Sequence, residues 1–208
     1  MFKLYGVENV ALMHGTFEEF VEMGGPIDKE PISYNVRAKD LVGIPEENCS
    51  YKVPADAKDR IVDMERVLEI VKDTNMPIYD TRGAAGFARG HIPGSVNIPS
   101  STFLEPDSAT KFKSKAELEE VLQEFGVSNH KTKDVLLSCG SCTSVCHLAV
   151  AMDECGYKTP LFYDGRYVRS CRSVLKILFA VRFLIFLPMV TSWGEWGKDP
   201  DTPKEVVP

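Results

Sequence analysis

The chain has 208 residues, of which 44% are hydrophobic, and its formal net charge at pH 7 is -6. This length can bury one hydrophobic core and part of a second, and the negative charge excludes the basic surface that nucleic-acid-binding proteins carry. The first residues, Met1 to Leu4, lack the charged and apolar pattern of a secretory signal peptide. The composition therefore favours a soluble intracellular protein with no nucleic-acid partner.

Residues 1–25 have the pattern of the end of a larger unit. We expect a strand over residues 7–13 and a short helix over 17–23, closed by two glycines and a proline. Neither element has a local partner against which it could bury its apolar face. Residues 26–60 are rich in proline and charge, which is typical of a linker. We therefore predict a remnant of a first domain, then a linker, then a second domain over 61–208.

From residue 61 the hydrophobic pattern becomes regular. Apolar residues recur at helical spacing over 61–73, so we predict a helix with one apolar stripe there. A short strand is expected over 76–79, followed directly by Asp80 and Arg82. A turn within residues 90–99 leads into another strand.

The second half of this domain continues the alternation of helices and strands. A capping box over residues 114–117 predicts a helix that Gly126 ends. An apolar run at 135–138 suits a buried strand, a helix follows over 145–155, and a further strand spans 160–163. Such alternation predicts an α/β fold with a parallel sheet flanked by helices. Ligands of these sheets bind at the carboxyl ends of the strands.

Cys139 lies where the central predicted strand ends and a short loop begins. The N–H groups of such a loop, with the positive end of the following helix dipole, stabilise negative charge. A thiol there is expected to lose its proton more readily than an ordinary cysteine and to act as a nucleophile. The alternative is a buried structural cysteine, which is our interpretation of Cys146 and Cys155. Because Cys139, Cys142 and Cys146 are clustered, we expect a reducing compartment and no disulfide framework.

A resemblance to the rhodanese domain family rests on motifs in order along the chain: Asp80-x-Arg82, Gly90-His-Ile-Pro-Gly-x-x-Asn97, the Cys139 loop, Tyr163-Asp-Gly165 and Trp193-Gly-Glu-Trp196. The likeness is strongest to the second, catalytic domain of the two-domain thiosulfate and 3-mercaptopyruvate sulfurtransferases, over about residues 61–200. The first residues, through His14-Gly-Thr-Phe17, resemble the closing segment of the first domain. The resemblance implies a rhodanese-like sheet preceded by a truncated rhodanese domain.

The resemblance also implies a sulfurtransferase. Cys139 would take the outer sulfur of thiosulfate or 3-mercaptopyruvate, carry it as a persulfide, and yield it to cyanide or to a thiol such as thioredoxin or glutathione. The loop that holds the persulfide would consist of Gly140, Ser141, Cys142, Thr143 and Ser144. No metal or organic cofactor and no membrane partner are implied, and the location would be the cytoplasm or the mitochondrion.

Three further polar residues are predicted to support the site. Asp80 and Arg82 would form an ion pair that, with His91, ties the strand end to the turn over 90–94. A charge relay through the same three residues is the alternative. We expect His147, near a helix start, to face solvent, the alternative being assistance to the nucleophile.

The Cys139 loop departs from the family's usual Cys-Gly-Ser-Gly-Val-Thr, because Cys142 takes the place of the second glycine. If that position needs a positive φ, its side chain strains the loop. The spacing Cys139-x-x-Cys142 also allows the second cysteine to resolve a persulfide on the first as a disulfide. The family's arginines for the mercaptopyruvate carboxylate are missing, since Ala85-Gly86-Phe87 replaces Gly-Arg-Phe and no second segment is present. Arg89 is a candidate substitute for one of them.

Two other classes of function compete with the enzyme. A rhodanese-fold phosphatase needs an arginine at the sixth position after its cysteine, and Val145 at that position argues against it. A catalytically weak binding or redox-regulatory module is favoured by Cys142 and by the missing arginines. It remains the alternative to a sulfurtransferase.

Residues 166–191 interrupt the resemblance. Within them, residues 174–190 are apolar apart from Lys176, Arg182 and one proline, which is marginal for a membrane span. Removing the insertion restores the family's Tyr-Asp-Gly-Ser-Trp sequence. We interpret the insertion as the translation of a retained intron, and a membrane anchor is the alternative.

Overall fold

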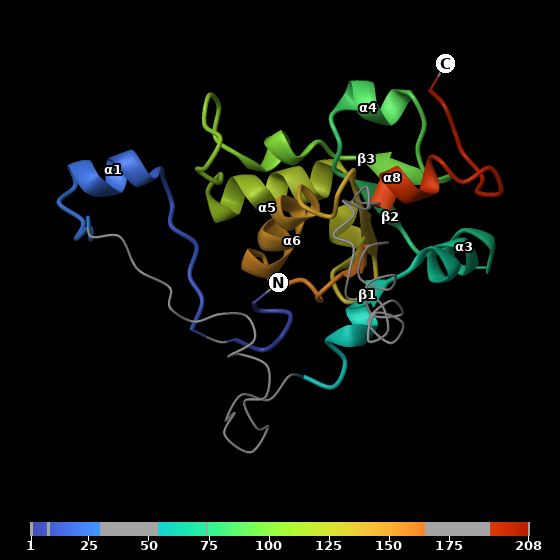
Figure 1. Ribbon diagram of the computed structural model, residues 1–208, viewed down its shortest axis with the longest axis horizontal. Helices are drawn as coiled ribbons and strands as arrows, with labels where there is room; N and C mark the ends of the chain where they lie inside the picture. Colours follow the sequence, from blue (N-terminus) through green and yellow to red (C-terminus); the bar gives the residue numbers. More distant parts are fainter. Residues whose placement is uncertain (1, 8, 30–53, 74, 165–191, 208) are drawn as a thin grey trace, which may run out of the picture. The chain divides into compact units, whose positions relative to one another are not determined.

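The computed structural model describes residues 2–7, 9–29, 54–73, 75–164 and 192–207 (Figure 1). The chain divides into two compact units, Met1–Ala57 and Lys58–Pro208, which are described separately. The insertion over 166–191, with its intron and membrane-anchor interpretations, lies outside the described residues, as does most of the predicted linker. Where the structure describes the chain, it has no helix long and apolar enough to cross a membrane.

Among its described residues, the first unit contains the short helix α1 (Phe17–Glu22). Thr16 begins it with a capping box, because its hydroxyl accepts the N–H of Glu19 at 3.2 Å while the Glu19 carboxylate accepts the N–H of Thr16 at 2.9 Å. This confirms the predicted helix. The predicted strand over 7–13 is wrong for the residues described there, which are not in a strand. An isolated extended segment gains no ladder hydrogen bonds, so its apolar pattern alone does not make a strand.

The second unit is built on a parallel sheet, as predicted (Figure 1). Its five strands, in chain order, are β1 (Ile61–Val62), β2 (Ile78–Asp80), β3 (Ser95–Asn97), β4 (Leu136–Ser138) and β5 (Leu161–Tyr163). Their order in the sheet is β1-β5-β4-β2-β3. The strand that precedes Cys139 is therefore the central one, with neighbours on both sides.

The predicted helix over 61–73 begins later than expected. Residues 61–62 form the edge strand β1 beside β5, and α3 (Met64–Asp73) follows. Between the two elements, Asp63 Oδ1 accepts the N–H of Arg66 at 3.0 Å. This N-terminal cap explains why the helix starts after the strand and does not absorb it.

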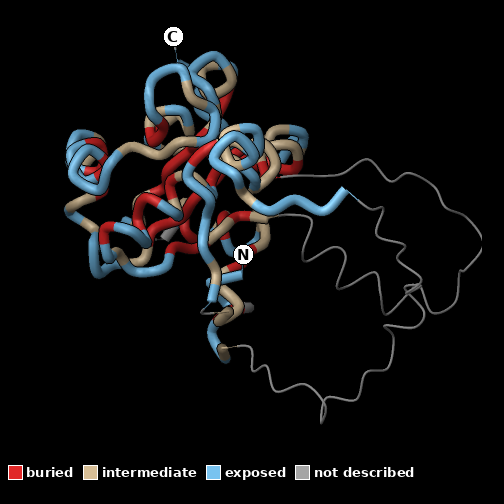
Figure 2. The backbone as a smooth tube through the Cα atoms, turned by 90° about the vertical axis from the view of Figure 1, so that its left-hand side faces the viewer, coloured by how far each residue is buried: buried red, intermediate tan, exposed pale blue. Residues whose placement is uncertain are grey.

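Helices cover both faces of the sheet (Figures 1 and 2). One core includes Leu137 and the buried side chains of α5 (Lys115–Glu124) and α6 (Val145–Glu154). The other includes Leu136 with residues of α3 and α8 (Ser192–Trp196). Neighbouring residues of β4 thus enter opposite cores, as alternation along a strand requires. The chain also forms elements that we did not predict: α4 (Ala84–Ala88), η2 (Lys58–Arg60), η3 (Ser100–Phe103) and η4 (Val127–His130).

The ends of α5 follow the predicted signals. The Ser114 hydroxyl accepts the N–H of Glu117, and the Glu117 carboxylate accepts the N–H of Ser114 at 2.9 Å. The Ser114 hydroxyl also donates to Glu117 Oε2 at 2.5 Å, and this hydrogen bond, with the one from the Ser114 N–H, holds the pKa of Glu117 below its usual value. Gly126 follows the helix with φ 71°, which a glycine adopts without strain.

Asp134 joins two segments next to β4 and β5. Its carboxylate accepts from Lys158 Nζ at 2.9 Å and from Arg60 Nη1 at 2.6 Å. The hydrogen bond from Lys158, with a further one from Arg60, lowers the pKa of Asp134 despite partial burial. A carboxyl with a lowered pKa stabilises the fold above its unfolded pKa, and this contribution is lost as the pH falls through the folded value.

We expect Asp134→Asn to lower the free energy of unfolding by about 1 kcal/mol at neutral pH, since the pair is partly exposed. The difference from the parent should shrink in acid, below the usual carboxyl pKa, because the parent then also loses its charge. Urea unfolding at pH 7 and at acid pH measures both values. A difference that is constant with pH would show that the charge of Asp134 does not matter.

Candidate active site

The candidate site lies at the carboxyl ends of β2 and β4. These strands are paired in register, with Asp80 opposite Ser138. Beyond them the Thr81 N–H donates to the Ser138 carbonyl at 2.9 Å. Thr81 and Cys139 are therefore the first residues past neighbouring strand ends, at the edge of a parallel sheet where ligands bind.

Cys139 is held by its main chain and is buried. Its carbonyl accepts the N–H of Trp193 at 3.0 Å, and its Sγ accepts the N–H of Ser141 at 3.4 Å. The residue is 1% exposed and belongs to the core beneath α5 and α6. The nucleophile predicted from the sequence thus lies in the expected strand-loop-helix setting, but deeper than a loop residue ordinarily lies.

The loop from Cys139 to α6 contains an unusual backbone conformation. Cys142 has φ 55°, so the condition under which its side chain strains the loop is met. A non-glycine residue in this left-handed region costs about 1–2 kcal/mol. The loop tolerates this because other contacts fix it: the hydroxyls of Thr81 and Ser144 lie 2.9 Å apart, and Ser141 Oγ donates to Thr143 Oγ1 at 3.1 Å. A left-handed residue of this kind is a component of backbone nests that bind anions.

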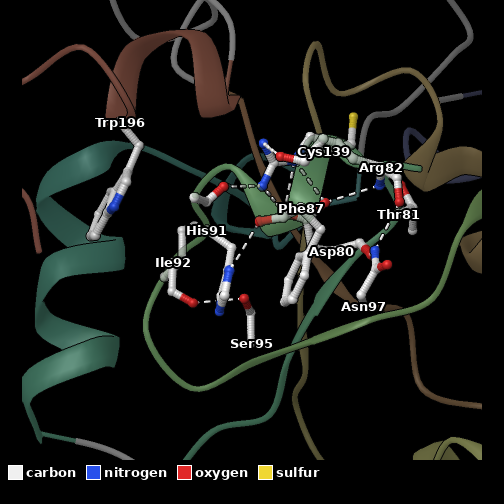
Figure 3. A network of polar contacts seen from close by, with 12 residues as sticks. Asp80, Thr81, Arg82, Phe87, His91, Ile92, Ser95, Asn97, Cys139 and Trp196 are labelled. Atoms are coloured by element: carbon white, nitrogen blue, oxygen red, sulfur yellow. Dashed lines mark hydrogen bonds and ion pairs between the residues drawn. The ribbon is translucent and has the colours of Figure 1, made fainter. Parts of the chain in front are cut away.

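Asp80 and Arg82 form an ion pair at the end of β2 (Figure 3). Arg82 Nε donates to both carboxylate oxygens at 3.0 and 2.9 Å, and Nη2 donates to Oδ2 at 2.7 Å. Arg82 Nη2 also donates to the Gly90 carbonyl at 2.8 Å, and Asn97 Nδ2 donates to the carbonyls of both members of the pair. These contacts tie the strand end to the following turn, as the structural interpretation expects.

Trp193 connects this ion pair to the cysteine loop. The Arg82 guanidinium lies 4.3 Å from the centre of the Trp193 ring, in cation–π geometry. The same residue donates its N–H to the Cys139 carbonyl. The ring leaves no room for side chains beside it, since a Cβ on Gly90 would lie 3.0 Å and one on Gly197 2.8 Å from it. The sequence motif marks Trp193 but gives no sign of these contacts.

His91 faces the turn and the C-terminal segment. Its Nδ1 donates to the Phe87 carbonyl at 3.1 Å, its ring stacks on Phe87 at 3.7 Å, and its Nε2 lies 3.4 Å from Glu205 Oε2. Figure 3 shows the Cys139 sulfur directed away from this ring. The geometry gives no support to a charge relay from His91 to the cysteine.

His147 is half-buried on the first turn of α6, and not fully exposed as we expected. Its Nδ1 lies 3.3 Å from the Ser144 carbonyl, and its ring stacks on Phe112. These contacts place it against the end of the loop. Across the described residues, no group of three or more histidine, cysteine or acidic side chains could hold a metal ion.

Comparisons with known proteins agree with this geometry. Residues 63–169, about half of the chain, match the family model of the rhodanese-like domain. The chain is 29% identical over 176 residues to the thiosulfate sulfurtransferase of Gallus gallus, covering 80% of this chain and 55% of that protein. It is 29% identical over 181 residues to the 3-mercaptopyruvate sulfurtransferase of Rattus norvegicus, covering 81% and 54%.

A solved structure shows the same fold. The 3-mercaptopyruvate sulfotransferase SseA of Escherichia coli superimposes with a TM-score of 0.58 at 22% identity, covering 78% of this chain and 58% of that one. The chain spans about half the length of the curated relatives it matches. By its family model, its sheet and the setting of Cys139, the chain belongs to the rhodanese-like domain family.

Proposed function

We propose that this chain is a sulfurtransferase in which Cys139 carries the transferred sulfur. The observation that supports this most directly is the position of Cys139 between the end of the central strand and the start of α6, with its sulfur accepting the Ser141 N–H. A sulfur in this position has a main-chain donor and a helix N-terminus to stabilise negative charge. The relatives named sulfurtransferases support the same class of reaction.

The reaction has two displacement steps. In the first, the Cys139 thiolate attacks the outer sulfur of thiosulfate, a Cys139 persulfide forms, and sulfite leaves with the electron pair of the broken sulfur–sulfur bond. In the second, an acceptor such as cyanide or a thiol attacks the outer sulfur and restores the thiolate. Each intermediate is anionic, so the groups that favour the thiolate also favour the persulfide. Because Cys139 is buried, we infer that the donor reaches it past the more exposed loop residues 141–143.

The proposal also concerns which sulfur donor the chain uses. We infer that thiosulfate is used more readily than 3-mercaptopyruvate, because α4 offers the uncharged residues 84–88 where the family has an arginine. Arg89 is exposed just after this helix and is the candidate contact for a carboxylate donor. For the acceptor we propose a small or protein thiol.

The intact mass of the protein after treatment with thiosulfate tests the proposal. We expect a gain of one sulfur atom, located on the peptide that contains Cys139, and its removal by cyanide. The same measurement with 3-mercaptopyruvate compares the two donors. A folded protein that gains no sulfur from either donor, or gains it on another cysteine, would contradict the proposal.

Two observations favour the alternative of a catalytically weak binding or redox-regulatory module. Cys139 is buried, and Cys142 in the same loop has a positive φ that is strained for a residue with a side chain. If the loop does not open, no donor reaches the sulfur, and the same mass measurement then gives an unmodified protein. Detection of a persulfide on Cys139 would therefore indicate the sulfurtransferase, and its absence would indicate the binding or regulatory module.

A further inference from the structure

The cysteine loop holds a second thiol whose role the sulfur-transfer reaction leaves unassigned. Cys139 and Cys142 are both reduced in the structure. Cys139 is a member of the core beneath α5 and α6, and the Cys142 side chain packs against that same core. The two thiols therefore face one cluster of side chains from the same short loop.

The backbone between the two cysteines allows them to approach each other. The chain bends continuously over residues 140–143, so the three steps from Cys139 to Cys142 are shorter than the roughly 10 Å that an extended chain would span. A disulfide requires α-carbons about 4.4–6.8 Å apart. Gly140 adds no side chain between them, and even a Cβ there would meet nothing within 4 Å. Neither the bend of the loop nor the space beside Gly140 opposes closure of a disulfide.

The third cysteine of this region is placed differently. Cys146 lies within α6 and is an exposed residue, not the buried one we expected, whereas Cys142 is half-buried in the loop. Partial burial of the Cys146 thiol, with a further contribution from Cys139, raises the pKa of Cys146. Cys142 also has a positive φ, which sets its side chain at an angle that an extended or helical residue would not give. Of the two neighbours, Cys142 shares with Cys139 both the short loop and the core against which it packs, and the variants described below separate its role from that of Cys146.

We propose, building on the proposed function, that Cys142 resolves the Cys139 persulfide and releases hydrosulfide. The Cys142 thiolate attacks the inner sulfur, Cys139 Sγ, and a disulfide forms between the two residues. The sulfur–sulfur bond of the persulfide breaks, and its electron pair leaves with the outer sulfur, which takes up a proton as hydrosulfide. The outer sulfur is reduced and the two cysteines are oxidised, so the step needs no other oxidant or reductant.

In this reaction Cys142 takes the place of an external thiol and reduces the persulfide of its own chain. One hydrosulfide is released per chain, after which the disulfide stops the cycle. An external dithiol such as dithiothreitol restores both thiols and starts the next cycle. Sulfur transfer to an outside acceptor competes with closure of the disulfide, so the balance between the two depends on the reducing conditions.

A single-turnover experiment without oxygen tests the step. The reduced protein receives one equivalent of thiosulfate with no added thiol, and hydrosulfide and intact mass are followed over time. The parent should release one hydrosulfide per chain and end two hydrogen atoms lighter than the dithiol, with a disulfide mapped to residues 139 and 142. Cys142→Ser should keep the added sulfur and release hydrosulfide at least about tenfold more slowly, because it loses the intramolecular attack.

Two more variants make the result decisive. Cys142→Gly removes the thiol and suits the positive φ, so it should behave as Cys142→Ser does even if serine disturbs the loop. Cys146→Ser is the matched control, because it removes the neighbouring cysteine on α6 and leaves the loop intact, and it should release hydrosulfide as the parent does.

The outcomes separate this proposal from the proposed function. If the parent and both Cys142 variants gain a sulfur and release hydrosulfide equally slowly, the resolving step is wrong while Cys139 remains the carrier. A disulfide between residues 142 and 146 would also overturn it. If no variant gains a sulfur, both proposals fail.

Discussion

The Cys139→Ser variant should remain folded and lose at least about a thousandfold in sulfur transfer, the scale on which loss of a catalytic nucleophile acts. A serine hydroxyl is scarcely ionised near neutral pH and forms no persulfide, so neither step of the reaction has a carrier. The exchange keeps the size of a buried side chain that is 1% exposed. The Ser141 N–H that donates to the sulfur can donate to the new oxygen, so the free energy of unfolding should fall by no more than about 1–2 kcal/mol.

The assay measures thiocyanate formed from thiosulfate and cyanide, alongside urea unfolding of the same preparations. Cys146→Ser serves as the control, because that residue lies on α6 outside the loop. It should keep the parent's rate. If Cys139→Ser turns over as fast as the parent, the carrier is elsewhere or the chain is not a sulfurtransferase.

The surroundings of Cys139 could be predicted because their signals are local. An apolar run followed by helical periodicity places a strand, a loop and a helix over 135–155, and the structure has them as β4 and α6. A positive φ at Cys142 could be raised only as a condition, because the family has glycine at that place in the loop, and the structure meets it. Each of these features depends on residues within about one turn or one strand of the site.

The errors share a non-local cause. Residues 61–62 continue the apolar stripe of α3, yet they form β1 because residues 162–163 of β5 pair with them. The strand expected over 7–13 has no such partner among the described residues of its unit, so the same kind of pattern gave a wrong prediction there. Residues 61–62 become a strand because a segment about a hundred residues away pairs with them. The described residues among 7–13 do not, because no described segment of their unit pairs with them.

The contact of Trp193 with Arg82 shows the same limit at the site itself. The ion pair of Arg82 with Asp80 spans two positions in the chain and could be predicted. The ring that covers the guanidinium comes from α8, more than a hundred positions later in the sequence. No periodicity or spacing reports it, although it joins the ion pair to the backbone of Cys139.

Replacing Arg82 with methionine should lower the free energy of unfolding by about 3–5 kcal/mol, because it leaves a buried carboxylate without its counter-ion. The Asp80 side chain is 1% exposed and that of Arg82 11%, so solvent cannot replace the lost hydrogen bonds. Methionine keeps an apolar stem beneath Trp193, so the loss reports mainly on charge and on the bond to the Gly90 carbonyl. Urea unfolding followed by tryptophan fluorescence measures it.

Two further variants identify the cause of that loss. Arg66→Met removes an arginine from an exposed pair with Glu69 on α3 and should cost less than about 1 kcal/mol, because both side chains are hydrated. Asp80→Asn combined with Arg82→Met removes both charges and should be more stable than Arg82→Met alone, since no unpaired carboxylate remains in the interior. If the double variant is instead the less stable of the two, the buried charge is not what destabilises the single one. The role of Arg82 would then lie in its contacts with Gly90 and Trp193, which hold the turn and the cysteine loop together.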